Sequence, residues 1–289
     1  MIRVENLVYK YDADDAPVLK SVNLEIRDGE YVALIGPNGC GKTTLIKHFN
    51  ALLSPTEGNV WIDGLNTKDP SAVGEIRQRV GMIFQNPDNQ IVGMTVEEDV
   101  SFGPGNLNLP PREIRQRVDK ALEAVGLTGY AGRLPHTLSG GQKQLLAIAG
   151  ILAMMPKHIA LDEPTSSLDP AGRRSIAAVL RKLNNQGMTI IHITHNVEEI
   201  VGADRVIVME AGSILLDGKP EQVFSKGERL KALGMDVPQV TELMQRLQRM
   251  GEKVRTDILT VDDACVEIAA LLRRGRIAAP TSPGMQARG

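Results

Sequence analysis

The sequence YVALIGPNGCGKTT occupies residues 31–44 and carries the strongest local pattern in this 289-residue chain. Five apolar residues, Tyr31–Ile35, predict a short buried strand that ends at glycine. Residues Gly36–Thr43 then match the pattern G-x-x-x-x-G-K-T of a phosphate-binding loop, whose backbone N–H groups turn inward around an anion. A helix is expected over about Lys42–Leu53, and its positive N-terminal end favours the same anion. Strand, loop and helix in this order predict an α/β domain that binds a nucleotide.

This loop predicts contacts to both a nucleotide and a metal ion. The Lys42 ammonium is expected to bridge the β- and γ-phosphates, and the Thr43 hydroxyl is expected to ligate Mg²⁺. The predicted cofactors are therefore ATP and Mg²⁺. The loop residues assigned to nucleotide contact are Gly36, Pro37, Asn38, Gly39, Cys40, Gly41, Lys42, Thr43 and Thr44.

The stretch His158–Glu163, HIALDE, predicts the other half of a hydrolytic site. Asp162 emerges at the carboxyl end of a buried strand, where ligands of α/β sheets bind, and is expected to hold Mg²⁺. Glu163 follows and is placed to polarise an attacking water. An acidic pair after a core strand is often only a turn, but the complete phosphate loop in the same chain favours the catalytic interpretation.

Strand and helix signals alternate along the chain and predict a parallel sheet covered on both faces. The expected strands are Val22–Ile26, Tyr31–Ile35, Asn59–Asp63, Val80–Phe84, His158–Leu161, Thr189–Thr194 and Arg205–Met209. Helical spacing over about residues 87–155, interrupted by prolines and glycines, predicts a helical insertion. A further change in pattern after Pro220 predicts a nucleotide-binding domain over 1–220, a helical domain over 221–272 and a disordered tail over 273–289.

The composition excludes several classes of function. A net charge of −2 and 3% aromatic residues argue against nucleic acid as a partner. The two cysteines, Cys40 and Cys265, are far apart in sequence and do not form a disulfide framework. The N-terminus lacks an apolar signal core, and the longest apolar run, Leu145–Met155, is too short for a bilayer. These features predict a cytoplasmic protein that reaches a membrane through a partner.

From about Ile2 to Gly218 the chain resembles the ATP-binding cassette (ABC) ATPases. Leu138–Gln142 reads LSGGQ and is similar to the signature motif of that family. The resemblance implies a P-loop NTPase fold of ABC type, with a mostly parallel sheet, an N-terminal antiparallel β subdomain, a helical subdomain and here a small C-terminal helical domain. It also implies that Ser139, Gly140, Gly141 and Gln142 contact the nucleotide.

Further motifs of the family have matches in the expected order. Gln85 resembles the Q-loop glutamine that contacts Mg²⁺ and senses the transport partner, and Asp169 lies in a D-loop. His195 resembles the switch histidine that contacts the γ-phosphate. Tyr11 resembles the aromatic residue that stacks on adenine, with Tyr9 as the competing choice. With Lys42 and Glu163, the resemblance makes Gln85 and His195 the catalytic set.

The same resemblance implies a split active site. In such enzymes ATP lies between the phosphate loop of one subunit and LSGGQ of another, so the chain requires a second cassette, identical or related. Cys40 stands where the family commonly has Ser. This is either a near-isosteric exchange or a redox-sensitive thiol whose pKa is lowered at a helix N-terminus.

Two further strings narrow the resemblance. Phe84–Gln90, FQNPDNQ, and Thr95–Gly103 are similar to the ATPases of energy-coupling factor (ECF) transporters, which take up cobalt, nickel and vitamins. The resemblance implies a groove after Gln85 for a transmembrane coupling protein, a substrate-binding membrane subunit, and a peripheral location at the cytoplasmic face of the membrane. The region after Pro220 would contribute to the ATPase dimer. The alternatives are another import system, an ABC ATPase acting on nucleic acid or the ribosome, or a regulatory nucleotide-binding module.

Overall fold

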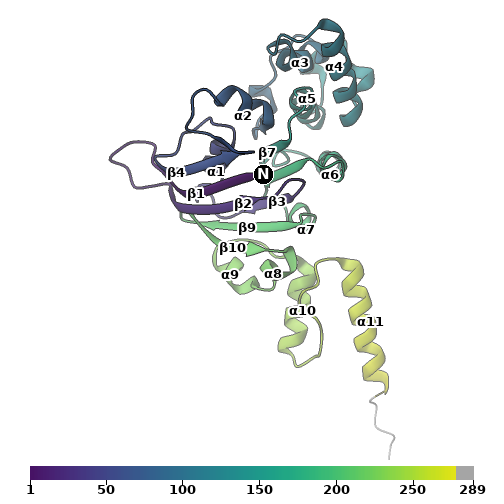
Figure 1. The fold of residues 1–289 in the computed structure, drawn as a ribbon. Helices are drawn as coiled ribbons and strands as arrows, with labels where there is room; N and C mark the ends of the chain where they lie inside the picture. Colours follow the sequence, from purple (N-terminus) through teal and green to yellow (C-terminus); the bar gives the residue numbers. More distant parts are fainter. Residues whose placement is uncertain (278–289) are drawn as a thin grey trace, which may run out of the picture. The chain divides into compact units, whose positions relative to one another are not determined.

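The computed structural model describes the backbone of residues 1–277 and the side chains of residues 1–273, and it divides the chain into two compact units (Figure 1). The first unit is Met1–Lys219 and the second begins at Pro220. The strands of the first unit are β1 (Ile2–Tyr9), β2 (Leu19–Ile26), β3 (Tyr31–Ile35), β4 (Glu57–Ile62), β5 (Leu65–Asn66), β6 (Val80–Ile83), β7 (His158–Asp162), β8 (Thr189–Ile193), β9 (Arg205–Glu210) and β10 (Ser213–Gly218). Its helices are α1 (Lys42–Phe49), α2 (Val73–Arg79), α3 (Val96–Gly105), α4 (Pro111–Val125), α5 (Gly140–Leu152), α6 (Pro170–Asn185) and α7 (Val197–Val201).

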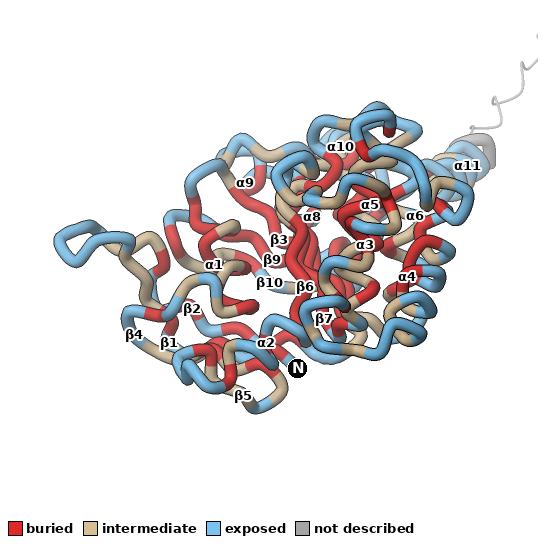
Figure 2. Tube along the Cα trace, turned by 90° about the horizontal axis from the view of Figure 1, so that it is seen from above, coloured by how far each residue is buried: buried red, intermediate tan, exposed pale blue. Residues whose placement is uncertain are grey.

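A six-stranded sheet with the order β10-β9-β3-β8-β7-β6 forms the centre of the first unit. Neighbouring strands from β9 to β6 run parallel, and only the β9–β10 pair is antiparallel. Figure 2 shows β9, β3, β7 and β6 as largely buried, which explains their nearly continuous runs of apolar residues. Because the strands are parallel, the loops that follow β3, β8, β7 and β6 all emerge at one edge of the sheet.

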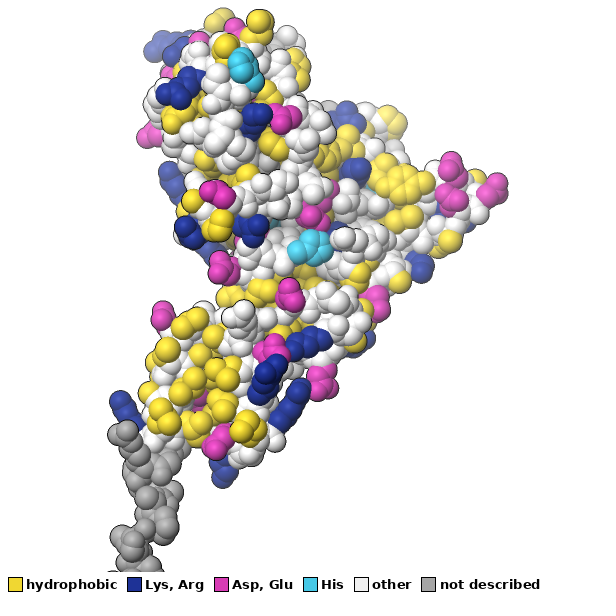
Figure 3. Space-filling view, turned by 180° about the vertical axis from the view of Figure 1, so that it is seen from behind, with side chains coloured by type: hydrophobic (Ala, Val, Ile, Leu, Met, Phe, Trp, Pro, Cys, Tyr) yellow, Lys and Arg dark blue, Asp and Glu magenta, His cyan; other side chains and the backbone are white. Residues whose placement is uncertain are grey.

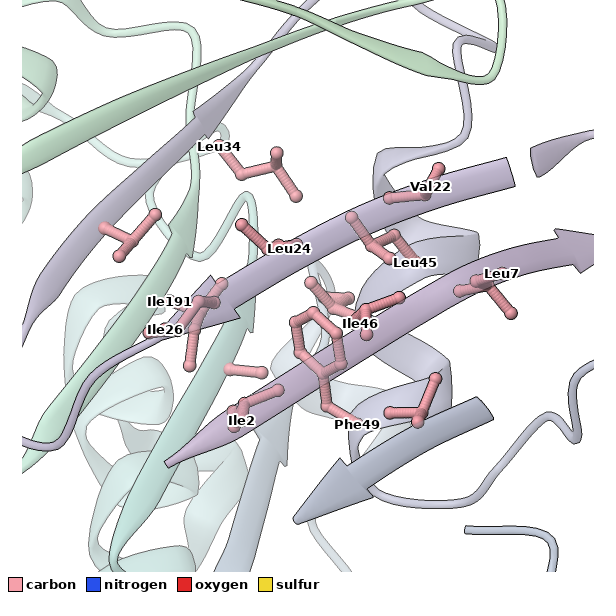
Figure 4. Packing of buried hydrophobic residues seen from close by; sticks show 14 of the residues in the cluster. Ile2, Leu7, Val22, Leu24, Ile26, Leu34, Leu45, Ile46, Phe49 and Ile191 are labelled. Carbon is pink, nitrogen blue, oxygen red and sulfur yellow. The ribbon is translucent and has the colours of Figure 1, made fainter. Parts of the chain in front are cut away.

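A second, antiparallel sheet has the order β2-β1-β4-β5. Helix α1 packs its apolar side against a core that takes residues from both sheets (Figure 4). Leu45, Ile46 and Phe49 of α1 are fully buried there, beside Ile2 of β1 and Leu34 of β3. Burial of these side chains ties the helix that follows the phosphate loop to the strand that precedes it.

Helices α3, α4 and α5 form a separate cluster within the first unit (Figure 1). The 3₁₀ turn η1 (Pro87–Asn89) precedes α3, and the turns η2 (Thr128–Tyr130) and η3 (Pro135–Thr137) lie between α4 and α5. Capping boxes start two of the helices. Thr95 pairs with Glu98 at α3, and Ser139 pairs with Gln142 at α5. The helix α5 therefore begins inside the LSGGQ string because its Ser and Gln satisfy the first free N–H groups.

The second unit is helical as far as it is described, with α8 (Pro220–Phe224), α9 (Gly227–Ala232), α10 (Gln239–Arg249) and α11 (Val261–Ile277). Its small core contains Met244, Val254, Ile258 and Ala264. Other apolar side chains, on α10, just after its end and on α11, are exposed. Figure 3 shows hydrophobic side chains gathered on one face of this unit. The exposed side chains are Leu243, Met250, Val261, Val266 and Leu272.

Several sequence expectations about element boundaries were wrong. Strands β4 and β6 end at Ile62 and Ile83, one residue before their expected ends at Asp63 and Phe84. Helix α1 ends at Phe49 rather than Leu53, because Asn50 caps it and Ala51 adopts a left-handed φ of 54° that no α-helix continues. Strand β8 stops at Ile193, before Thr194. Helix α11 runs to Ile277, past the expected end of the helical domain at residue 272, and the rest of the expected disordered tail lies outside the described residues.

Candidate active site

Four neighbouring parallel strands deliver the candidate catalytic residues to one edge of the six-stranded sheet. The phosphate loop follows β3, Gln85 follows β6, Asp162 ends β7 and His195 follows β8. The register pairs Leu34 with Ile193 and Asp162 with Ile193, so the strand ends are level. We call the side chains that this arrangement assembles the strand-end cluster. It consists of Lys42, Thr43, Gln85, Asp162, Glu163 and His195.

At two glycines of the phosphate loop, a Cβ atom would clash with neighbouring atoms. Gly36 has a φ of 150°, and a Cβ there would lie 2.3 Å from the backbone oxygen of Met209. Gly41 has a φ of 104°, and its Cβ would lie 2.8 Å from a Leu19 methyl group. Around Gly39, by contrast, a Cβ would meet nothing within 4 Å. The loop is therefore held from behind by the core and remains open on its outer side.

The Lys42 side chain folds over this loop. Its ammonium donates hydrogen bonds to the carbonyl oxygens of Gly36 at 2.7 Å and Pro37 at 3.0 Å, and the residue is buried. Helix α1 has no side-chain cap and no acidic residue in its first turn. The first N–H groups of the helix and the ammonium therefore create a positive potential in the loop. This potential fits a phosphate group.

The Thr43 hydroxyl and the Asp162 carboxylate lie together. The hydroxyl is 3.0 Å from Oδ1 and 2.8 Å from Oδ2 of Asp162 and donates to this carboxylate. Burial raises the pKa of Asp162, the nearby Glu163 charge raises it further, and the Thr43 hydrogen bond partly opposes both effects. A hydroxyl and a carboxylate are hard oxygen ligands, so the pair fits Mg²⁺, whose charge would offset the cost of burying the carboxylate.

Glu163 and His195 are in direct contact. His195 Nε2 lies 2.9 Å from Glu163 Oε1, and both side chains are partly exposed. The Glu163 backbone has a left-handed φ of 49°, uncommon for a non-glycine residue, and its N–H donates to the carbonyl of Ile193 at 3.0 Å. This tie between the end of β8 and the residue after β7 holds the glutamate beside the histidine.

Gln85 reaches the same region through a residue that the sequence did not single out. Its Nε2 donates to the Ser166 hydroxyl at 3.3 Å, and that hydroxyl donates to the carbonyl of Glu163 at 3.0 Å. The only sequence signal for Ser166 is its place between Glu163 and the expected D-loop. Ser166 thus links the glutamine after β6 to the glutamate after β7.

The structure distinguishes between the two tyrosines proposed for adenine. Tyr11 is 55% exposed and bonds through its hydroxyl to Thr44 Oγ1 at 3.1 Å, beside the phosphate loop. Tyr9 packs against the core and makes edge contacts with the rings of Tyr11 and His48. Tyr11 therefore offers the free ring face, and Tyr9 supports it from behind.

The LSGGQ residues lie elsewhere on the first unit. They line a hollow of 460 Å³ together with Ser167, Leu168 and Asp169, and we call it the signature hollow. Ser139 Oγ accepts from Gln142 N at 3.3 Å, while Gln142 Oε1 accepts from Ser139 N at 2.9 Å. This capping box leaves the N–H groups of Gly140 and Gly141 without an intrahelical partner, as at any helix start. The signature helix thus presents an anion-binding end away from its own phosphate loop.

Asp169 and Cys40 have local roles that the sequence did not reveal. Asp169 caps α6 by accepting a hydrogen bond from Gly172 N at 2.8 Å. Cys40 is buried, and burial raises the pKa of its thiol more than the neighbouring Lys42 lowers it. The alternative of a redox-sensitive thiol needs a lowered pKa and is therefore not favoured, because the desolvation of the thiolate exceeds the attraction of the positive charge. A near-isosteric exchange explains Cys40 better than a redox-sensitive one.

Comparisons with known proteins agree with this geometry. The family described as ABC transporter matches residues 19–166. The chain is 57% identical over 270 residues to the cobalt import ATP-binding protein CbiO of Syntrophus aciditrophicus, covering 93% of this chain and 96% of the relative. It is 54% identical to the energy-coupling factor transporter ATP-binding protein EcfA1 of Caldanaerobacter subterraneus, covering 91% and 96%.

Solved structures give the same result. The structure of cbiO1 from Clostridium perfringens, described as part of the ABC transporter complex cbiONQ, superposes with a TM-score of 0.74 at 39% identity and covers 86% of this chain and 96% of that one. A dimeric ATP-binding cassette bound to ADP and Pi superposes with a TM-score of 0.68 at 34% identity, covering 76% and 98%. The chain therefore belongs to the ABC transporter family, within the group of energy-coupling factor ATP-binding proteins.

Proposed function

We propose that this chain is the ATP-hydrolysing subunit of an ECF-type importer, which couples ATP hydrolysis to the uptake of a metal ion or vitamin. The observation that carries the proposal is the convergence of Lys42, Asp162, Glu163 and His195 at the ends of β3, β7 and β8. These residues supply a positive phosphate cradle, an acidic metal ligand, a base and a γ-phosphate contact. Hydrolysis of a nucleoside triphosphate at a P-loop uses these groups.

In this proposal each residue of the strand-end cluster has one task. The Lys42 ammonium and the α1 N–H groups hold the phosphates in place. Glu163 orients and deprotonates the attacking water, and His195, in contact with Glu163, binds the γ-phosphate. Mg²⁺, held by Thr43, Asp162 and Gln85, neutralises phosphate charge when bound. Tyr11 stacks on the adenine ring.

The second half of the proposed site comes from another cassette, either a copy of this chain or a sister ATPase. The signature hollow is separate from the strand-end cluster, so its Ser139, Gly140 and Gly141 would bind the γ-phosphate held by the partner. The exposed apolar side chains of α10 and α11 support a further contact between subunits through the second unit (Figure 3). We propose that residues 221–272 form this dimerisation domain.

The membrane partners are proposed from the relatives and from the segment after Gln85. Every helix among the described residues is too short or too polar to cross a bilayer. The relative cbiO1 is described as part of a larger transporter complex. In this chain Asp88 and Asn89 are exposed on η1, where a transmembrane coupling protein would contact them. The protein would then lie at the cytoplasmic face of the membrane, with the cargo chosen by a separate membrane subunit.

Two experiments test the proposal. The purified chain is expected to hydrolyse ATP only with Mg²⁺ present, and the absence of any turnover with or without a partner subunit would contradict it. In detergent-solubilised membranes, the tagged chain is expected to capture an integral membrane protein. Asn89→Arg on η1 should abolish this capture, whereas Gln116→Arg, on the exposed side of α4, should not. Capture of ribosomes or DNA instead would favour the non-transport alternative.

A further inference from the structure

Directly behind His195 lies a group of buried polar side chains that the proposed hydrolysis does not use. Tyr31 is 4% exposed, His192 1%, Thr194 3% and Glu199 7%. They come from β3, β8, the turn after β8 and the short helix α7. A carboxylate this deeply buried costs several kcal/mol unless hydrogen bonds compensate for the lost water, so the group needs an explanation.

The hydroxyl of Thr194 is the link to the switch histidine. It donates a short hydrogen bond to Glu199 Oε2, and it accepts the backbone N–H of Asn196 at 3.0 Å. A hydroxyl has only one hydrogen, so donation to Glu199 leaves its lone pairs free for that N–H. Thr194 and Asn196 are the two neighbours of His195 in the chain. The carboxylate therefore fixes the direction of the hydroxyl, and the hydroxyl fixes the turn that carries His195.

The other side of Glu199 faces His192. His192 Nε2 lies 3.5 Å from Glu199 Oε2, and His192 Nδ1 lies 3.0 Å from the Tyr31 hydroxyl. Burial lowers the pKa of His192 to about 4 and raises the pKa of Tyr31, so both side chains are neutral at pH 7. The arrangement assigns the proton of His192 to Nε2, with Nδ1 accepting from Tyr31. Within this group, Thr194 donates to Glu199, whereas His192 Nε2 only faces the same carboxylate oxygen at 3.5 Å.

We propose that Glu199 and Thr194 are positioning residues that hold the His195 turn in its productive orientation. The proposal rests on the proposed function, because it gives His195 the γ-phosphate contact. Neither residue touches Glu163 or the phosphate loop in any contact the structure shows. Their effect passes through the backbone on both sides of His195, whose imidazole is then set against Glu163 at 2.9 Å.

A matched pair of substitutions on one strand tests the proposal. Thr194→Val removes the hydroxyl that joins Glu199 to the Asn196 amide. Thr189→Val is the control, because Thr189 is fully buried at the other end of β8 and its hydroxyl accepts from Gly29 N at 2.9 Å. Each exchange keeps the volume of the side chain, removes one buried acceptor and leaves one backbone N–H without a partner. Thr194→Val also removes the donor to the buried Glu199 carboxylate, so it is expected to lose more thermal stability than Thr189→Val.

Hydrogen exchange at the Asn196 amide in the nucleotide-free protein tests the positioning directly. In Thr194→Val this amide is expected to exchange about tenfold faster than in the wild type, because the loss of one hydrogen bond lowers its protection by that order. Thr189→Val should leave the exchange of Asn196 unchanged, and Thr194→Ser should restore it. An unchanged rate in Thr194→Val would overturn the proposal, whatever the enzyme's activity.

Steady-state hydrolysis tests the link to His195. We expect Thr194→Val to lower kcat about 10- to 100-fold with the KM for ATP within about twofold, because a misplaced histidine affects the reaction more than binding. Thr194→Ser should recover most of kcat, and Thr189→Val should keep it. Equal kcat losses in both valine variants would reduce Thr194 to a structural role and overturn the proposal. A wild type without any turnover would instead contradict the proposed function, and the exchange of Asn196 would still decide the positioning role.

Glu199→Gln is the second variant, in case Thr194→Val does not fold. The amide keeps an acceptor for Thr194 but carries no charge, so the network loses its fixed direction. We expect an intermediate loss of kcat and an Asn196 exchange rate between those of the wild type and Thr194→Val. A Glu199→Gln variant with wild-type exchange and wild-type kcat would overturn the role given to the carboxylate.

Discussion

The strand-end cluster and the signature hollow are both proposed to bind phosphate, yet they are built differently. In the cluster, Thr43 pairs with Asp162 and Glu163 with His195, each from a loop after a different strand, while Lys42 donates within its own loop. In the hollow, the side chains of Ser139 and Gln142 cap their own helix, and the N–H groups of Gly140 and Gly141 face outward. The strands of a single chain bring all side chains of the strand-end cluster together. In contrast, the N-terminal end of α5 in the signature hollow makes no contact with the strand-end cluster of the same chain.

This difference explains why a single chain would be an incomplete enzyme. Parallel strands bring distant residues to one edge regardless of any partner, so the proposed base, metal ligands and phosphate cradle come together on folding. Helix α5, which begins within LSGGQ, belongs to the α3–α5 cluster. Its N-terminal end lies at another surface of the first unit.

The largest effect is expected at the base of the strand-end cluster. Glu163→Gln should lower the hydrolysis rate about 100- to 10,000-fold, the range typical of a lost general base, while ATP still binds. Single-turnover hydrolysis and nucleotide binding measured on one preparation separate the two effects. The matched control is Glu198→Gln, which removes an exposed charge from α7 near His195 and should leave turnover within about twofold of the wild type. Near-normal hydrolysis by Glu163→Gln would reject the assignment.

The next prediction tests whether the two regions work in pairs. Lys42→Ala removes the cradle, and Gly141→Asp puts a negative charge at the signature helix, where a Cβ has room at 3.5 Å from Gly172. Each variant alone should be nearly inactive. If the chain pairs with itself, mixing them should restore up to about a quarter of the wild-type activity, because half of the dimers would contain one intact site of two.

The control for this mixture is Lys42→Ala combined with a chain that carries both substitutions. It contains no intact site and should show no recovery. Differently tagged subunits show whether mixed dimers form. Mixed dimers without any recovered activity would contradict a site divided between two chains.

Much of the strand-end cluster could be predicted from the sequence, because its residues lie in strings whose chemistry is local. The phosphate loop, the Asp162–Glu163 pair and the strand before each of them are visible without long-range information. The family resemblance is confirmed by the relatives, which match over almost the whole chain. The contacts between strings could not be predicted, because they depend on strand order. Ser166 joins Gln85 to Glu163 only because β6 lies beside β7.

Element ends and buried polar contacts were also beyond the sequence. The helix after the phosphate loop stops at Phe49 because Ala51 turns left-handed, although nothing in the string ALLS forbids a helix. The strand β10, Ser213–Gly218, was not predicted, since a short apolar run before a glycine has no clear period. Tyr31 and His192 meet because β3 pairs with β8, a register that no local pattern reveals.

A smaller effect is expected where the two regions are physically connected. Asp88, three residues after Gln85, pairs with Lys143 of the signature helix at 2.7 Å. Gln90 holds the same segment to β6 by accepting from Phe84 N at 2.8 Å. Because the Asp88 carboxylate is largely exposed, a double-mutant cycle with Asp88→Asn and Lys143→Met should give a coupling energy of about 0.2–1 kcal/mol in urea unfolding. Zero coupling would show that the ion pair does not join the regions.

The smallest effect concerns the cost of holding the strand-end cluster together. Burial raises the pKa of Asp162, so the folded protein binds a proton there more strongly than the unfolded chain does. The charged carboxylate therefore lowers stability at neutral pH. This loss of stability is complete above the raised pKa and disappears as the pH falls below the ordinary value of 3.8.

Asp162→Asn, which can still accept from Thr43, should melt at a higher temperature than the wild type at pH 7.5 although it is inactive. The difference should shrink as the pH is lowered, and melting curves at several pH values measure it. A variant that melts below the wild type at pH 7.5 would show that the Thr43 bond outweighs the burial of the charge, and that this region, like the signature hollow, is satisfied without a metal ion.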